Sequence, residues 1–276
     1  MKDIVLPGRE YYKPFMRPSR VKRRWRDGKP AICTAVALND PSVAELVSLL
    51  GFDCLWIDLE HHGVSVETAA QLMRAARVGG ADVMARPAKG EFMRMGRLLE
   101  MGASGILYPR CDDALEAAEV VRWSKFAPMG ERGIDGGNPD NPYLLSGVED
   151  YVQHANEETF IGVQVESPSA VAHARAMAEV EGVDLLFFGP GDYSVLSGVP
   201  GKTDAPVVRE AMEVTCREAL AAGKRFGTIS GDADSARRLL DMGATFVVQS
   251  ADIVLLRDGL LRLREELSAC GFAFEA

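Results

Sequence analysis

The chain has 276 residues, of which 47% are hydrophobic and 26% charged, a composition that fits a globular protein of two small domains or one barrel. Its net charge near −9 argues against nonspecific attraction to nucleic acid and favours an enzyme acting on small molecules. No stretch reaches the roughly 18 uninterrupted apolar residues of a membrane span, so we expect no membrane contact and a cytoplasmic location. The five cysteines are widely spread and form no C-x-x-C pair, which predicts neither a disulfide framework nor a zinc site.

Residues 1–29 form an N-terminal arm in which aromatic residues are interleaved with arginines and lysines. A nucleic-acid interpretation of this mixture conflicts with the acidic character of the whole chain. We therefore expect the arm to pack on a neighbouring subunit or across the floor of the folded domain.

From residue 31 onward, short apolar runs alternate with helical patterns, which is typical of repeated strand-helix units and a parallel sheet. The helical segments include 41–51, 65–80 and 233–243, and several close with a glycine that can cap a helix. No glycine-rich phosphate turn follows the first strand, as an open doubly wound sheet would favour. We predict a TIM (β/α)8 barrel over residues 30–276, with eight strands at 31–38, 54–60, 81–87, 105–109, 160–167, 184–190, 225–230 and 245–250.

One connection, 128–143, is long and rich in Gly, Pro, Asn and Asp. Loops of this length are usually functional or disordered. A mobile flap over the barrel mouth and an inert surface excursion are both open interpretations.

Charged side chains fall where the predicted strands end, which is where barrels of this kind assemble their active sites. Glu166 and Asp192 follow neighbouring strands, and two carboxylates in one mouth repel each other unless a cation lies between them. Oxygen ligands favour Mg2+ or Mn2+, although each acid could instead pair with an arginine or cap a helix. Arg86 is held at a strand end by Pro87 and can stabilise a developing enolate, or it can simply close the rim with an ion pair.

His61 follows two acids at the end of the second strand, and its imidazole is suited to moving a proton near neutral pH. A purely hydrogen-bonding role in the rim is the alternative. Lys89 lies beyond a strand end and Lys224 begins the seventh strand at the opposite rim, so Schiff-base chemistry is disfavoured.

At these residues the sequence resembles the HpcH/HpaI aldolase family of metal-dependent class II pyruvate aldolases. The similarity covers roughly residues 30 to 260, in family order and with compatible spacing. It is carried by the motifs WIDLEHH (56–62), ARP (85–87), LLEMGASGILYP (98–109), GERG (130–133), VQVES (163–167) and GVDLLFFGPGDYS (182–194).

The resemblance implies that a divalent metal is held by Glu166 and Asp192, with Mg2+ or Mn2+ first and Co2+ as a further candidate. It implies that Arg86 stabilises the enolate and that His61 moves the proton. The residue matching the aspartate that partners this histidine in many relatives is Glu100, one methylene longer. The implied contacts to the pyruvate portion come from Gln164 and from the turn Gly189, Pro190, Gly191 and Asp192.

The implied reaction is the reversible cleavage of a 4-hydroxy-2-oxo acid to pyruvate and an aldehyde through a metal-bound pyruvate enolate. The family also implies a homo-oligomer, a trimer or a hexamer with exchanged terminal helices. An acyl-CoA lyase of the citrate lyase β or malyl-CoA lyase type would keep the fold and metal but change the substrate. A catalytically silent barrel scaffold, with the arm as its working surface, is an alternative of another class.

Overall fold

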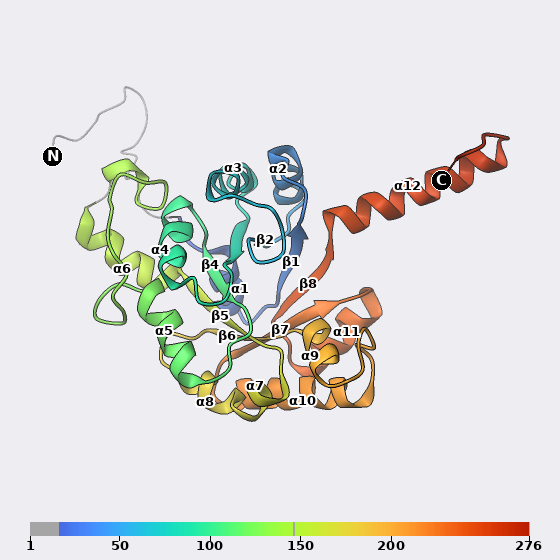
Figure 1. Ribbon diagram of the computed structural model, residues 1–276. Helices are drawn as coiled ribbons and strands as arrows, with labels where there is room; N and C mark the ends of the chain where they lie inside the picture. The colour runs from blue at the N-terminus through green and yellow to red at the C-terminus, as the bar shows by residue number, and fades with distance from the viewer. Residues whose placement is uncertain (1–16, 146, 276) are drawn as a thin grey trace, which may run out of the picture.

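The computed structural model of the protein describes residues 17–145 and 147–275, and its centre is a closed barrel of eight parallel strands (Figure 1). Each strand pairs with the next along the chain, and the last pairs with the first. The predicted (β/α)8 barrel is therefore confirmed, and all eight predicted runs match strands to within a few residues. These are β1 (Ala31–Val36), β2 (Cys54–Asp58), β3 (Asp82–Arg86), β4 (Gly105–Tyr108), β5 (Phe160–Val165), β6 (Leu185–Phe188), β7 (Arg225–Ser230) and β8 (Phe246–Ala251).

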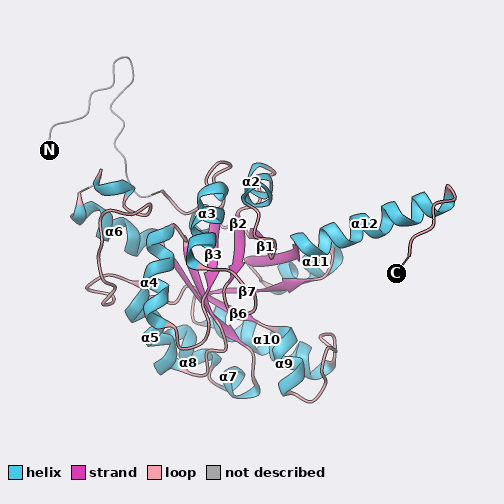
Figure 2. Ribbon diagram, turned by 45° about the horizontal axis from the view of Figure 1, so that its top comes forward, coloured by secondary structure: helices cyan, strands magenta, loops and turns pink. Residues whose placement is uncertain are grey.

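Helices surround the strands, as the separate colours in Figure 2 show. Side chains of Asp, Ser and Asn type favour helix starts, and here the oxygens of Asp40, Ser65 and Asp232 accept backbone N–H groups at three of them. In the described part of the chain, no helix combines the length and apolar character that crossing a bilayer requires. The helices are α1 (Arg20–Arg26), α2 (Pro41–Leu49), α3 (Val66–Ala76), α4 (Phe92–Met101), α5 (Ala114–Ser124), α6 (Val148–Glu158), α7 (Pro168–Ala172), α8 (Ala174–Glu179), α9 (Pro190–Leu196), α10 (Pro206–Ala221), α11 (Ala233–Met242) and α12 (Asp252–Ala269), with a 3-10 turn at Pro142–Leu144.

Large apolar side chains fill the interior of the barrel. The ring of Trp56 meets that of Phe187 edge-on, with centroids 5.8 Å apart. Gly105 on β4 leaves space for Phe160, since a Cβ at that position would lie 2.3 Å from the phenylalanine ring. Because the interior is a packed core, ligands can bind only at the two ends of the barrel.

Helix α1 closes the floor of the barrel, the end at which the strands begin. Trp25 is 5% exposed and packs edge-to-face against Phe160 and Phe246, at centroid distances of 5.7 and 6.2 Å. Its indole Nε1 donates a hydrogen bond to the carbonyl of Thr245 at 3.0 Å. The helix is thus anchored to β5 and β8, two strands from the second half of the chain.

Asp82, the first residue of β3, holds the start of this helix. Its Oδ2 accepts hydrogen bonds from the Ser19 hydroxyl at 2.6 Å and from the Val21 amide at 2.8 Å. Residues 17–29 of the expected arm therefore pack across the barrel floor, one of the two expected placements, whereas residues 1–16 lie outside the described residues. The domain boundary at residue 30 stays a prediction.

The long segment 128–143 lies near the floor and not over the mouth. Helix α5 runs back from the mouth to the floor, and the segment then leads through α6 to the start of β5. The buried Arg132 binds Asp140 at 3.1 Å, and the carbonyl of Pro139 accepts a hydrogen bond from Arg77 at 3.1 Å. The expectation of a flap over the mouth is therefore not met within one chain.

Helix α12 departs from the ring of helices around the barrel. Figures 1 and 2 show it projecting away from the strands, which it contacts only where it begins. Five of its leucines are between 48 and 56% exposed, namely Leu255, Leu256, Leu260, Leu261 and Leu263.

Candidate active site

The barrel mouth brings together most of the site residues that the sequence predicts. Arg86 is the last residue of β3, and Gln164 lies near the end of β5. Glu166 follows β5 directly, and Asp192 lies in the first turn of α9. The ends of β5 and β6 are adjacent, and Arg86 reaches Gln164 from β3 with a hydrogen bond, so these side chains belong to one cluster.

Arg86 is the centre of that cluster, and it is only 7% exposed. Its Nε and Nη2 donate to the two carboxylate oxygens of Asp58 at 2.9 and 2.6 Å, a two-point ion pair. Its Nη1 donates to Oε1 of Gln164 at 3.3 Å, and its guanidinium lies 4.6 Å from the centre of the Trp56 ring. The ion pair of the rim interpretation is therefore present, and the enolate role of Arg86 stays a prediction.

Asp58 orients this arginine. Burial by itself would raise the pKa of Asp58, but the hydrogen bonds and charge of Arg86 outweigh it and hold that pKa below its usual range. The backbone amides of Glu60 and His61 also donate to Oδ1, at 2.9 and 3.4 Å. The ionised carboxylate therefore fixes both the arginine and the turn that follows β2.

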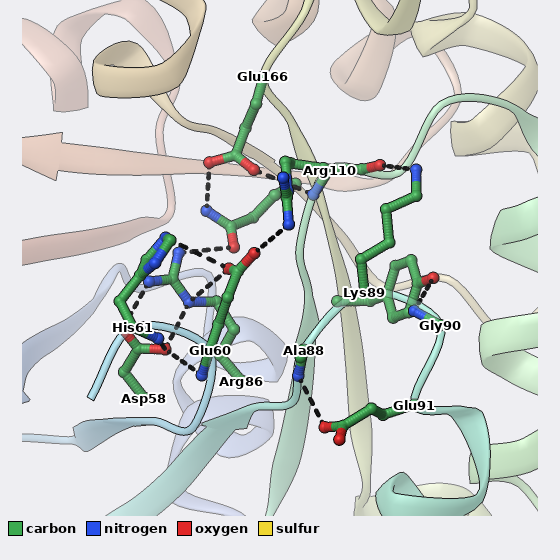
Figure 3. A network of polar contacts seen from close by, with 12 residues as sticks. Asp58, Glu60, His61, Arg86, Ala88, Lys89, Gly90, Glu91, Arg110 and Glu166 are labelled. Atoms are coloured by element: carbon green, nitrogen blue, oxygen red, sulfur yellow. Dashed lines mark hydrogen bonds and ion pairs between the residues drawn. The ribbon is translucent and has the colours of Figure 1, made fainter. Parts of the chain in front are cut away.

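Glu60 lies between three cationic or titratable side chains, as Figure 3 shows. Its carboxylate is 5% exposed and contacts Arg86 Nε at 3.4 Å, Arg110 Nη2 at 2.9 Å and His61 Nε2 at 3.6 Å. The His61 side chain is 55% exposed, so it borders both solvent and the site. Within one chain the acidic neighbour of this histidine is Glu60.

Arg110, in the turn after β4, shapes the other side of the site. Its backbone has a φ of 45°, in the left-handed region, and its amide donates to Oε2 of Glu166 at 3.0 Å. The ammonium of Lys89 donates to the Arg110 carbonyl at 2.6 Å and pairs with Asp112 at 2.6 Å, which stabilises this turn. Lys89 thus supports the rim.

Glu166 is the carboxylate with the most perturbed titration at the mouth. Burial and the charge of Asp192 raise the pKa of Glu166 to about 7, against the lowering effect of the Arg110 amide. Its Oε1 accepts a hydrogen bond from Gln164 Nε2 at 2.9 Å. A Cβ on Gly189 would lie 2.2 Å from Oε1, so only glycine fits beside this carboxylate.

This pair of acids fits a divalent cation. A carboxylate that resists ionisation because it is buried, and because a second acid lies nearby, is in the electrostatic situation that a cation relieves. Each oxygen of Glu166 accepts one hydrogen bond and keeps further acceptor capacity. No group of three or more His, Cys, Asp or Glu side chains gathers into a metal site in the described residues. Glu166 and Asp192 are the two carboxylates that would hold the ion.

The remaining predicted residues divide into two groups. Gly189, Pro190 and Gly191 form the turn into α9 at the mouth, and a Cβ on Gly191 would meet only open space. Glu100, by contrast, is the second-last residue of α4, which runs from the mouth back toward the floor. Burial raises the pKa of Glu100, and its charged neighbours include Arg132. The structure therefore does not bring Glu100 to His61 within one chain.

Sequence reasoning did not assign site roles to Asp58, Glu60 or Arg110. Asp58 and Glu60 lie at the end of the second strand and alternate with the apolar Ile57 and Leu59. This alternation is the sequence feature that could have indicated that both acids point into the mouth. Arg110 lies two residues after β4, directly beyond the predicted strand 105–109.

Comparison with known proteins agrees with this geometry. The family model described as HpcH/HpaI aldolase/citrate lyase matches residues 34–258. The chain is 36% identical over 246 residues to the hydroxypyruvate/pyruvate aldolase of Pseudomonas aeruginosa, covering 89% of this chain and 91% of that protein. It is 31% identical over 239 residues to the 2-keto-3-deoxy-L-rhamnonate aldolase of Escherichia coli K12, covering 87% of this chain and 89% of that protein.

A solved structure extends the agreement to the fold. The HpcH/HpaI aldolase from Desulfitobacterium hafniense DCB-2 superposes with a TM-score of 0.86 at 28% identity, over 91% of this chain and 96% of that one. With the mouth described above and these relatives, the chain belongs to the HpcH/HpaI aldolase/citrate lyase family and is a carbon-carbon lyase.

Proposed function

We propose that the protein is a divalent-metal-dependent aldolase that reversibly cleaves a 4-hydroxy-2-oxo acid to pyruvate and an aldehyde. The observation that carries the proposal is the continuous hydrogen-bonded chain from Asp58 through Arg86 and Gln164 to Glu166. It links the group suited to an enolate with the carboxylate suited to a cation. Relatives at 36 and 31% identity bear the names of aldolases that act on 2-oxo acids.

Glu166 and Asp192 would hold the metal, and oxygen donors of this kind select Mg2+ or Mn2+, with Co2+ as a further candidate. When bound, the cation supplies Lewis-acid stabilisation of the negative charge that forms on the 2-oxo acid. Gln164 and the turn Gly189–Asp192 border the same space and are proposed to bind the pyruvate portion.

Arg86 is proposed to stabilise the enolate. Three of its N–H groups are already oriented by Asp58 and Gln164, so little reorganisation is needed when charge develops beside it. Its burial against Trp56 strengthens the interaction, because little water screens it.

His61 is proposed to move the proton between the C4 hydroxyl and solvent. The imidazole reaches the site beside Glu60 and is half exposed, which gives the proton an exit. Glu100 remains the predicted partner of His61, and that contact would have to form between two copies of the chain because the two residues lie at opposite ends of one barrel.

The helix α12 supports a homo-oligomer, for which a trimer or a hexamer is proposed. The eighth helix of such a barrel would normally cover β8 and β1, but α12 projects away from them (Figure 1). Leu46 and Leu49 on α2 and Leu50, which caps its end, are 58, 59 and 69% exposed, and Ile229 on β7 is 43% exposed. A second copy of α12 has the apolar character and length to cover this surface.

The function is tested by pyruvate release from 4-hydroxy-2-oxo acids, measured with a lactate dehydrogenase coupled assay before and after chelation of metal. Activity that disappears with the chelator and returns with Mg2+ or Mn2+ supports the proposal. Glu166→Gln should bind no metal in a calorimetric titration, whereas Glu67→Gln, an exposed acid on α3, should bind it normally. Cleavage of malyl-CoA without cleavage of any 4-hydroxy-2-oxo acid would instead support the acyl-CoA lyase, and inactivity with no metal binding would support the scaffold.

A further inference from the structure

A cavity of about 380 Å³ lies near the floor of the barrel, at the opposite end from the catalytic mouth. Its wall includes Ser104, which directly precedes β4, and Arg17, which precedes α1. Pro139 and Tyr143 of the long segment after α5 close another side. With a water molecule occupying about 30 Å³ of liquid, the space holds roughly a dozen waters or a small polar ligand.

Two arginines from distant parts of the chain converge on this cavity. Arg17 Nη2 donates to Asp82 Oδ1 at 3.3 Å and to Ser104 Oγ at 3.2 Å. Arg77, at the end of α3, uses Nη1 for the Pro139 carbonyl at 3.1 Å. Among the described residues no carboxylate forms a salt bridge with Arg77, whereas Arg17 shares an aspartate with the start of α1.

The guanidinium of Arg77 is held in place but is incompletely satisfied. Its Nε is buried and has no hydrogen-bond partner in the described structure. It lies against Gly102, where a Cβ would come within 2.5 Å of Nη2, so the glycine that ends α4 also makes room for the arginine. Burial, followed by the nearby positive charge of Arg17, lowers the pKa of Arg77.

The one acid that lines the cavity is already neutralised. Oδ2 of Asp140 accepts hydrogen bonds from Arg132 Nη2 at 3.1 Å and from the Tyr151 hydroxyl at 2.8 Å. Arg17 is paired with Asp82, and its repulsion of Arg77 is offset only in part by the charge of Asp140. At the mouth, two carboxylates repel each other and a cation would relieve the repulsion. In the floor cavity the charges are reversed, so an anion would relieve the repulsion between the two arginines.

A second basic pocket at the floor differs in this respect. It has a volume of about 290 Å³, and its Lys22 and Arg26 form ion pairs with Asp184 and Glu158 at 3.2 and 2.8 Å. Its other two cations, Lys224 and Arg225, donate hydrogen bonds to the carbonyls of Val183 and Trp25 at 2.8 and 3.2 Å. Acids therefore match half of its cations, and no buried guanidinium nitrogen without a partner lies among the described residues that line it.

We propose that the floor cavity is a binding site for a phosphate-type oxyanion, either inorganic phosphate or the phosphate group of a small ester, held by Arg17 and Arg77. Guanidinium groups recognise such oxygens through N–H donors. Arg77 lines the cavity without a salt bridge to any described carboxylate, and Ser104 supplies a hydroxyl. The site is separate from the catalytic mouth and does not depend on the proposed aldolase reaction. A bound anion would tie together the chain before α1, the end of α3 and the segment at 139–143.

The test is calorimetric titration of the full-length protein with inorganic phosphate and with ribose 5-phosphate. Arg77→Met should weaken phosphate binding by about ten- to a hundredfold, as expected for one charged hydrogen-bonding group. Arg74→Met, an exposed arginine on the same helix, is the matched control and should bind as the wild type does. Equal affinity for both ligands points to free phosphate, and tighter binding of the ester points to a phosphorylated metabolite.

Two further variants keep the test decisive if Arg77→Met folds poorly. Arg77→Lys keeps the charge and should retain weakened binding, and Ser104→Asp places a carboxylate beside Arg17 and should abolish binding while raising the melting temperature. Arg86→Gln, at the mouth, should leave phosphate binding unchanged. The proposal is overturned if 10 mM phosphate shows no binding, if Arg77→Met and Ser104→Asp bind normally, or if Arg86→Gln alone removes the binding.

Discussion

Replacing Arg86 by alanine should reduce both activity and stability, for separate reasons. The substitution leaves Asp58 and Glu60 buried at the mouth without their shared cation. Removing one partner of a buried ion pair costs about 3–5 kcal/mol of the free energy of unfolding. We expect about 3 kcal/mol, the lower end, because the Glu60 and His61 amides still donate to Asp58.

The stability loss should depend on pH in a defined direction. In the wild type the pKa of Asp58 is lowered, so its ion pair adds stability above the usual carboxylate pKa near 4 and loses it as the pH falls further. In Arg86→Ala, burial acts without the arginine, so the pKa of Asp58 rises and the ionised form costs stability as the pH increases. The difference between the two proteins should therefore be largest near pH 7 and shrink toward pH 4.

Urea unfolding followed by circular dichroism measures this, with an expected shift of the midpoint of roughly 1 M at pH 7. Turnover should fall by about a hundred- to a thousandfold, the usual effect of removing one group that stabilises a developing anion. Adding Asp58→Asn to Arg86→Ala should recover much of the stability but none of the activity, because it removes only the uncompensated charge. Near-normal turnover of Arg86→Ala would refute the catalytic role, and a double variant no more stable than the single one would refute the electrostatic explanation.

Three further predictions concern other parts of the molecule. Burial and the charge of Asp192 raise the pKa of Glu166 to about 7, so protons compete with the metal for this carboxylate. Calorimetry should therefore show the affinity for Mg2+ or Mn2+ falling about tenfold per pH unit well below pH 7. Metal binding that does not change between pH 5 and 7 would contradict this. Burial lowers the pKa of Lys125 to about 8, so the charged form of this lysine destabilises the folded protein. As the pH rises from 7 to 10, the free energy of unfolding of the wild type should increase by about 2 kcal/mol relative to that of Lys125→Met, as measured by urea unfolding. A difference between the two proteins that stays constant with pH would count against this. Replacing Leu256 and Leu260 on α12 by glutamate should lower the mass of the assembly found by light scattering, without loss of helix content. Arg257→Gln on the same helix is the control and should leave that mass unchanged. An unchanged mass in the leucine variant would show that this face of α12 is not an interface.

The fold and part of the site follow from local sequence patterns. Eight apolar runs separated by amphipathic segments specify strands and helices, and a barrel places every strand end at one mouth, so the positions of Arg86 and Glu166 could be predicted. Their partners could not be, because hydrogen bonds between strand ends depend on rotamers and on register across the barrel. The ion pair from Glu60 to Arg110 joins β2 to β4 and skips the strand between them, a contact that no pattern along the chain indicates.

The position of 128–143 could not be predicted for a similar reason. Composition identified it as an irregular segment, but it did not show which end of the barrel the segment occupies. Direction along α5 decides this, together with the buried pair of Arg132 and Asp140. The glycine and proline content indicates an irregular segment but not the end of the barrel at which it lies.

The docking of α1 links the two ends of the chain during folding. Ribosomes synthesise α1 before any strand, yet Trp25 binds against Phe160 and Phe246 and donates to Thr245, residues made much later. The helix therefore has no complete binding site until β8 joins β1 and the barrel closes. Such long-range contacts slow folding and leave apolar surface exposed in the meantime. Burial of the Trp25 indole should accordingly mark the last step, in which the first helix made is held by the last strand made.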